Sequence, residues 1–97
     1  MYELKAISAV KKDLNDLDPT TVKEIREVHF RRIEESPHQA DPLGYVFKGL
    51  YSYHLRHAGT AYRIIYEIYE AEKLVIVLLI GSRENLYKRL RRRLRRR

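Results

Sequence analysis

The chain has 97 residues, of which 44% are hydrophobic and 34% charged, with no cysteine and a net charge of +7. Such a composition predicts one folded soluble domain, and the lack of cysteine excludes disulfide scaffolds, thiolate metal sites and cysteine nucleophiles. Eight of the twenty Lys and Arg residues lie in 88–97, which leaves twelve basic and thirteen acidic residues in 1–87. A phosphate-binding site in the body must therefore come from local clustering of a few cations.

The N-terminal half of the chain predicts one strand and two helices. Residues 2–7 alternate between apolar and polar types, which is typical of a half-buried strand. Apolar residues at helical spacing then predict a short helix that ends before Pro19. A longer helix is predicted from about Thr20 to Glu35, because Pro37 cannot continue it. We expect these two helices to form an antiparallel pair joined by a tight turn.

The C-terminal half predicts strands followed by a helix. Residues 45–57, 60–70 and 73–82 are rich in Tyr, Ile, Val and Leu and are separated by short turn segments, so they predict a three-stranded antiparallel meander. The run 74–80 is apolar on both faces, as expected of a strand inside a sheet. The arginine-rich segment after residue 83 carries leucines at intervals of four and predicts a final helix.

The expected fold is therefore α+β: an N-terminal strand, an antiparallel helix pair, the meander and a C-terminal helix. We divide the chain into a domain at 1–87 and an arginine-rich helix or tail at 88–97. Its longest apolar run is far shorter than the ~20 residues of a membrane helix. The first residues lack the features of a signal peptide. We expect a cytoplasmic protein that makes no membrane contact.

Strand alternation predicts a polar face on the sheet, because successive side chains point to opposite sides. In the last strand it assigns Leu74, Ile76, Leu78 and Ile80 to the side of the helix pair. The opposite, exposed side would then carry Ser52, His54, Arg56, Arg63 and Arg83.

This predicted face suits phosphate chemistry. Guanidinium groups bind phosphate oxygens through paired donors, and histidine transfers protons near neutral pH. Tyr87, one helical turn beyond Arg83, is placed to stack on a base. RNA cleavage by attack of a 2′-hydroxyl needs a group that takes its proton and positive charge around the phosphorane. No step of this chemistry requires a metal, and we expect no cofactor.

Other interpretations of the same residues remain open. Glu67 or Glu84 could pair with Arg63 or Arg83, which would make these arginines structural. The spacing of His29, His38 and His57 matches no metal site. The arginine tail could be a solvated extension, or it could bind RNA or DNA without sequence preference.

Four motifs in fixed order carry a resemblance to a known family. They are F-K-G-L at 47–50, Y-S-Y-H-L-R at 51–56, A-Y-R-I-I-Y at 61–66 and I-G-S-R-E-N-L-Y at 80–87. With the order of the expected elements, the chain resembles the RelE/ParE toxin superfamily over essentially its whole length.

In the RelE branch, the resemblance implies a toxin of a type II toxin-antitoxin system that cleaves messenger RNA on the ribosome. Arg63 and Arg83 resemble the arginines that stabilise the cleaved phosphate, and Tyr87 resembles the tyrosine that positions the nucleotide. The best-studied members of this branch carry two lysines where this chain has Ser52 and His54, which leaves two alternatives: His54 takes over proton transfer, or the activity is weaker or altered. The implied catalytic residues are Arg63, Arg83, His54 and Tyr87, and the implied substrate-binding residues are Arg56, Ser52 and Lys48.

The resemblance also implies partners. We expect a RelB-like cognate antitoxin that folds on binding, and contact with operator DNA only through the antitoxin complex. Tyr66, Ile68, the helix pair and the terminal helix would offer its docking surface. The alternative is a ParE-like toxin that inhibits a topoisomerase and has no nuclease activity. A third possibility is a non-enzymatic domain that binds nucleic acid through its arginine tail.

Overall fold

The computed structural model describes residues 1–96, and Arg97, the last residue of the predicted tail, lies outside the described residues. Its five-stranded sheet has the strand order β1-β5-β4-β3-β2. β1 runs parallel to β5, and the other neighbours are antiparallel. The strands are β1 (Glu3–Ala6), β2 (Asp41–Pro42), β3 (Leu50–His57), β4 (Thr60–Tyr69) and β5 (Leu74–Ser82).

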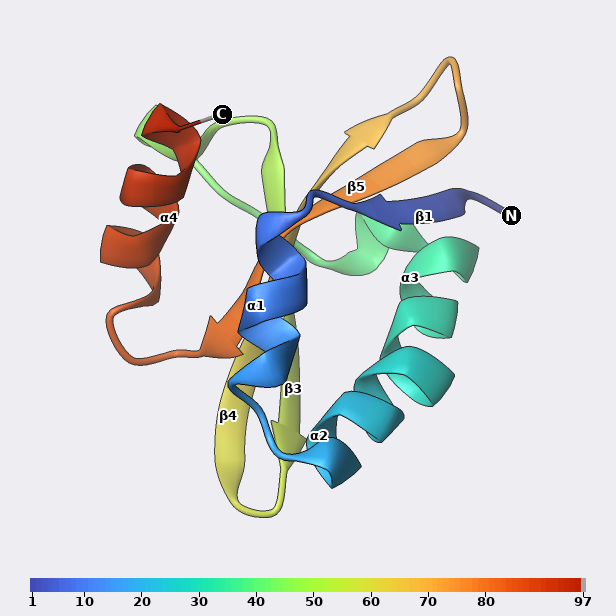
Figure 1. Cartoon of the computed structure of the whole chain (residues 1–97). Helices are drawn as coiled ribbons and strands as arrows, with labels where there is room; N and C mark the ends of the chain where they lie inside the picture. Colours follow the sequence, from blue (N-terminus) through green and yellow to red (C-terminus); the bar gives the residue numbers. More distant parts are fainter. Residues whose placement is uncertain (97) are drawn as a thin grey trace.

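The helices are α1 (Ala9–Asn15), α2 (Pro19–Glu24), α3 (Phe30–Glu35) and α4 (Leu86–Arg95). A π-helical turn at Ile25–His29 joins α2 to α3 without a break, so the two form the long helix that the sequence predicts. Asp18 caps its start, because one carboxylate oxygen accepts the backbone N–H groups of Thr20 and Thr21 at 3.0 and 3.1 Å. α1 and this long helix run in opposite directions (Figure 1).

The predicted α+β architecture is confirmed, with two differences in its strands. The first meander strand begins at Leu50 rather than at residue 45, because Tyr45–Phe47 forms a 3₁₀ turn. The two-residue strand β2 pairs with the start of β3 and was not predicted, since two residues show no periodicity. β5 lies between β1 and β4, which confirms the prediction of an interior strand. The described residues include no helix long and apolar enough to cross a bilayer.

Helices cover both faces of the sheet, and each face has its own core. α1 and the long helix pack on one face through Val10, Leu14, Ile25 and Ile33. α4 packs on the other face through Leu86 and Leu90, against a cluster that includes Leu50, Ile65, Leu78 and Leu79. In Figure 1, α4 lies to one side of β3 and β4, while α2 and α3 lie to the other.

Simple alternation fails in β5, so the predicted assignment of its side chains is wrong for Ile76 and Leu78, although it is correct for Ile80. Ile65 pairs with Leu79, whereas its neighbour Tyr66 pairs with Val77. Leu78 therefore has no partner in β4, which is a β-bulge, and the parity of the strand changes at this point. Val75, Val77 and Ile80 belong to the core beneath the helix pair, and Leu78 and Leu79 to the core beneath α4.

Tyr66 is not a docking residue, contrary to the expectation from sequence. Its side chain is completely buried, and its hydroxyl donates a 2.6 Å hydrogen bond to the carbonyl of Pro37. Burial raises the pKa of this phenol. Ile68, the other strand residue expected to contact the antitoxin, is half-buried against the same core.

Part of the predicted tail is held firmly against the domain. Asp13 of α1 is buried and accepts hydrogen bonds from the guanidinium groups of Arg93 and Arg89 and from the backbone N–H of Ile80. Arg93 also donates to the carbonyl of Leu78 at 3.0 Å. The arginines of α4 therefore fall into two groups, because these two are bound to the core while others on the helix face solvent.

Candidate functional site

Four of the predicted site residues line one pocket of about 340 Å³ on the α4 side of the sheet. These residues are His54, Arg56, Arg63 and Arg83. Cross-strand register brings them together, because His54 of β3 lies opposite Arg63 of β4. Arg63 in turn lies opposite Gly81 of β5, and Arg83 follows one residue after the end of that strand. The backbone N–H of Arg83 donates to the carbonyl of Ala61 at 3.2 Å, which fixes the exit of the chain from the sheet.

The pocket is positively charged. In residues 1–96, none of its three arginines forms an ion pair with a carboxylate. Arg56 donates to the carbonyl of Gly59 at 3.2 Å, which holds it over its own hairpin turn. Most of the excess positive charge of the chain lies in α4, and the rest of the domain is nearly neutral. An anion site in the domain therefore needs a local cluster of cations, and the three arginines of this pocket form such a cluster.

Tyr87 joins the pocket through Arg63. The guanidinium group of Arg63 donates a 3.0 Å hydrogen bond to the Tyr87 hydroxyl, and its central carbon lies 5.9 Å from the centre of the ring. On α4, Tyr87 stacks on Phe47 at 5.7 Å between ring centres and 29° between planes. The Tyr87 side chain remains 37% exposed, which leaves surface free for a ligand. Sequence reasoning did not find Phe47 as a contact of the site.

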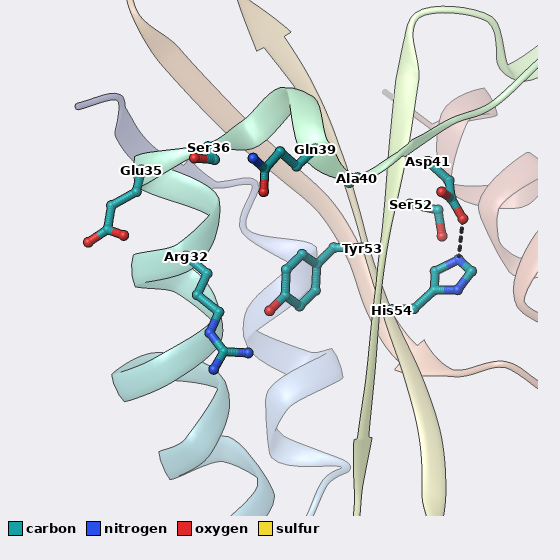
Figure 2. A pocket seen from close by; sticks show the side chains of 9 residues that line it. All are labelled: Arg32, Glu35, Ser36, Gln39, Ala40, Asp41, Ser52, Tyr53 and His54. Carbon is teal, nitrogen blue, oxygen red and sulfur yellow. Dashed lines mark ion pairs between the residues drawn. The ribbon is translucent and has the colours of Figure 1, made fainter.

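His54 has a carboxylate neighbour that the sequence analysis missed. Asp41 of β2 places an oxygen 3.5 Å from Nε2 of His54 (Figure 2). Both residues also line a second pocket of about 410 Å³, which runs around the edge of β3 to Arg32 and Glu35. Figure 2 places Asp41 and His54 on one side of β3 and Tyr53 and Arg32 on the other. The aspartate was not found because it belongs to the two-residue strand β2.

Two predicted substrate-binding residues are not in the cationic pocket. Ser52 lies on the predicted face of β3, but its side chain is buried, with 1% exposed, and its Oγ has no hydrogen-bond partner among residues 1–96. The prediction that Ser52 is exposed on the polar face is wrong, because Ser52 lies beside Ile65, a residue of the core beneath α4. Lys48 is exposed, but it ends the 45–47 turn and does not line the pocket.

The other histidines form two networks outside this pocket. His29 and His57 share the carboxylate of Glu24, and their hydrogen bonds lower the pKa of that carboxyl. His38 and Tyr2 likewise lower the pKa of Glu70, with the phenol as the larger cause. Residues 1–96 contain no group of three or more His, Asp or Glu side chains placed to hold a metal ion.

Comparison with solved structures relates this fold to known proteins. The toxin-antitoxin complex RelBE2 from Mycobacterium tuberculosis has a chain with a TM-score of 0.72 and 25% identity, covering 84% of this chain and 98% of the other. A chain of the intact RelBE complex from E. coli has a TM-score of 0.70 and 23% identity, with 87% and 99% covered. The isolated E. coli RelE toxin has a TM-score of 0.67 and 22% identity, with 97% and 99% covered.

Sequence comparison identifies the family. No curated protein sequence matches the chain. A family model described as "ParE-like toxin of type II bacterial toxin-antitoxin system" matches residues 4–91. This match includes the strands, the helix pair and the start of α4, and the structural matches independently support a RelE-like fold. The chain therefore belongs to the ParE-like toxin family of the RelE/ParE superfamily and is a toxin of a type II toxin-antitoxin system.

Proposed function

We propose that this toxin is a metal-independent endoribonuclease that cleaves messenger RNA on the ribosome, and that the cationic pocket is its active site. One observation carries the proposal: His54, Arg63 and Arg83 line a common pocket, and Tyr87 is hydrogen-bonded to Arg63 at the rim of that pocket. A general-base candidate, two permanent cations and an exposed aromatic ring are the groups that cleavage by a 2′-hydroxyl needs.

The arginines act on the phosphate. As the 2′-oxygen forms its bond to phosphorus and the bond to the 5′-oxygen breaks, negative charge grows on the non-bridging oxygens. Arg63 of β4 and Arg83, which follows β5, line the same pocket and can both donate to these oxygens. The products are a 2′,3′-cyclic phosphate and a free 5′-hydroxyl. Arg83 also stabilises the charge that develops on the leaving oxygen, which takes its proton from water.

His54 takes the proton of the attacking hydroxyl. Its imidazole lines the pocket beside Arg63, since the two residues are register partners on neighbouring strands. The best-studied members of the RelE branch, which this chain resembles, carry a lysine at this position. The Asp41 carboxylate, 3.5 Å from Nε2, orients the ring and stabilises the imidazolium that forms. Tyr87 receives the adjacent base on its exposed surface, with its hydroxyl held by Arg63.

The partners follow from the same proposal. The RelBE structures that this chain resembles contain a RelB antitoxin, which supports a RelB-like partner that folds on this toxin. An acidic amphipathic segment would complement the exposed arginines of α4, and the complex rather than the toxin would contact operator DNA. Action on ribosomes places the toxin in the cytoplasm. We retain residues 88–97 as a basic segment with a binding role distinct from that of the pocket.

Translation in a cell-free system, with primer-extension mapping of the message, tests the proposal. Wild-type toxin should cut the message within codons, and Arg83→Ala should slow cutting by about 10²- to 10³-fold, as for loss of one group that stabilises the developing oxyanion. His54→Ala should slow it by roughly 10²- to 10⁴-fold. Arg31→Ala, an exposed arginine on α3, serves as the matched control and should cut normally. An intact message with folded wild-type toxin would refute the nuclease.

The two alternatives make different predictions in the same experiment. If the toxin inhibits a topoisomerase, the message stays intact and DNA supercoiling by purified topoisomerases falls instead. If the arginine tail alone carries activity, substitution of exposed Arg92 and Arg95 by Gln abolishes it and Arg83→Ala spares it. These substitutions are preferable to truncation, because deletion of 88–97 would remove Leu90 from the core.

A further inference from the structure

We propose that a second surface, beside the catalytic pocket, binds unpaired RNA nucleotides that flank the cleaved one. We call it the flank surface and define it by Tyr45, Val46, Lys48 and Arg91. Tyr45 is its base-stacking residue. The inference rests on the proposed function, since it takes single-stranded RNA as the ligand.

Tyr45 and Val46 are large hydrophobic residues that are exposed to solvent, so packing of the fold does not account for them. The Tyr45 side chain is 100% exposed and that of Val46 is 72% exposed, at the start of the turn Tyr45–Phe47. Tyr45 also has a φ of 54°, in the left-handed region that a residue with a side chain adopts at a cost of about 1–3 kcal/mol. An exposed aromatic ring in a strained turn is typical of a ligand contact rather than of packing.

The turn is fixed next to the catalytic pocket. Phe47, two residues after Tyr45, stacks on Tyr87. The Phe47 ring has a second contact with α4, because the guanidinium of Arg91 lies 6.0 Å from its centre. Tyr87 in turn accepts a hydrogen bond from Arg63, which lines the pocket. A continuous series of contacts thus runs from the pocket across α4 to the turn. Figure 1 shows the segment between β2 and β3 passing beside α4.

The positive charge around the flank surface indicates which kind of ligand it binds. Neither residues 43–50 nor residues 85–96 contain an Asp or Glu, and the exposed cations of these two segments are Lys48, Lys88, Arg91, Arg92, Arg95 and Arg96. Arg89 and Arg93 of α4 form ion pairs with Asp13, so we do not count them among the cations that could bind a ligand. Exposed rings among unpaired cations fit single-stranded nucleic acid, whose bases stack while its phosphates meet the cations. A base-paired duplex offers no free base face to Tyr45.

Binding of a non-cleavable RNA tests the flank surface without reliance on catalysis. The probe is a fluorescein-labelled single-stranded RNA of about 12 nucleotides with 2′-O-methyl groups, measured by fluorescence anisotropy. Loss of one stacked base weakens binding by about 5- to 150-fold, so Tyr45→Ala should fall in this range. Tyr45→Phe keeps the ring and should bind as wild type does. Arg91→Ala should weaken binding more than the control Arg31→Ala, and should reduce its salt dependence.

Cleavage assays separate this inference from the proposed function. Tyr45→Ala should raise the message concentration needed for half-maximal cutting and leave the rate at saturation unchanged, whereas Arg83→Ala should lower the rate at saturation. If wild type cuts the message and Tyr45→Ala equals wild type in binding and cutting, the flank surface is refuted and the nuclease stands. If wild type binds RNA through Tyr45 but never cuts, the nuclease is refuted and the flank surface stands.

A photocrosslinker at position 45 identifies the source of the ligand. With benzoylphenylalanine in place of Tyr45 and programmed ribosomes as the target, crosslinks to the message support the inference. Crosslinks to ribosomal RNA alone overturn it, because those nucleotides do not flank the cleaved one. Crosslinks only to ribosomal proteins or to the antitoxin would overturn it, because the turn would then be a protein-binding surface.

Discussion

Replacement of Asp13 by Ala is expected to destabilise the domain by loosening α4 from α1. The carboxylate is 3% exposed and accepts the backbone N–H of Ile80 at 3.0 Å and Nη2 of Arg93 at 2.9 Å. Ala leaves the buried N–H without an acceptor, which costs about 1–3 kcal/mol. It also leaves the guanidinium of Arg93 without its carboxylate. Breaking a buried ion pair costs about 3–5 kcal/mol, and Arg93, at 19% exposed, is partly resolvated.

These effects overlap, so we expect a total loss of about 3 kcal/mol in the free energy of unfolding. For a domain of this size, that loss lowers the melting temperature by roughly 12 °C or more. Urea unfolding followed by circular dichroism measures it directly. Asp13→Asn keeps an acceptor for Ile80 but no charge, so its loss should be about half as large. Asp13→Ala combined with Arg93→Ala should lose less than the sum of the single variants, with a coupling of about 1–3 kcal/mol.

The control is Asp16→Ala at the end of the same helix, α1. This aspartate is exposed and has no ion pair among residues 1–96. Its loss should stay within about 0.5 kcal/mol. If Asp13→Ala and Asp16→Ala are equally stable, the Asp13 carboxylate does not anchor α4, and the reasoning from its burial and contacts is wrong.

Three further predictions concern stability. Tyr66→Phe should lower the free energy of unfolding by about 1–3 kcal/mol in urea titrations, because the buried carbonyl of Pro37 loses its donor; an unchanged midpoint would contradict this. The hydrogen bonds of the helix cap lower the pKa of Asp18 from 3.8 to about 2, so its stabilisation is complete above the unfolded pKa and is lost as the pH falls through the folded one. The difference in melting temperature between wild type and Asp18→Ala should therefore shrink between pH 5 and about pH 2, and a constant difference would argue against the cap. A Cβ at Gly81 would clash with Nη1 of Arg89, whose guanidinium would have to loosen its long 3.4 Å contact with Asp13 to move aside. Gly81→Ala should hence change stability by less than about 1 kcal/mol in the same titrations, and a larger loss would show that Arg89 is held rigidly.

The order of the elements and the placement of His54 beside Arg63 could be predicted from the sequence because both follow from local periodicity. Alternation in β3 and β4 placed His54 and Arg63 on one face, and the two strands are joined by a short hairpin that keeps this register. The same reasoning failed in β5, where a bulge at Leu78 reverses the parity. It also failed at Ser52, because parity identifies a face and does not reveal whether that face is covered.

Contacts between distant segments could not be predicted in this way. Asp41 meets His54 only because a two-residue strand pairs with β3, and Phe47 meets Tyr87 only because the loop between β2 and β3 packs against α4. Asp13 left a weak signal, since it lies three residues after Val10, on the side of α1 that turns towards the core. Its partners are 76 and 80 residues away, so no local pattern identifies them.

The sequence by itself determined the kind of fold, the neutral body with its basic C-terminus, and the arginines and histidine of the candidate site. Hydrophobic periodicity and charge are properties of neighbouring residues, and they survive without knowledge of the fold. Only the tertiary structure decided which of these groups share a pocket, which arginines of α4 are bound to Asp13, and which remain exposed for a ligand. Those outcomes depend on the bulge in β5 and on the packing of α4 across the sheet, where residues far apart in the chain meet.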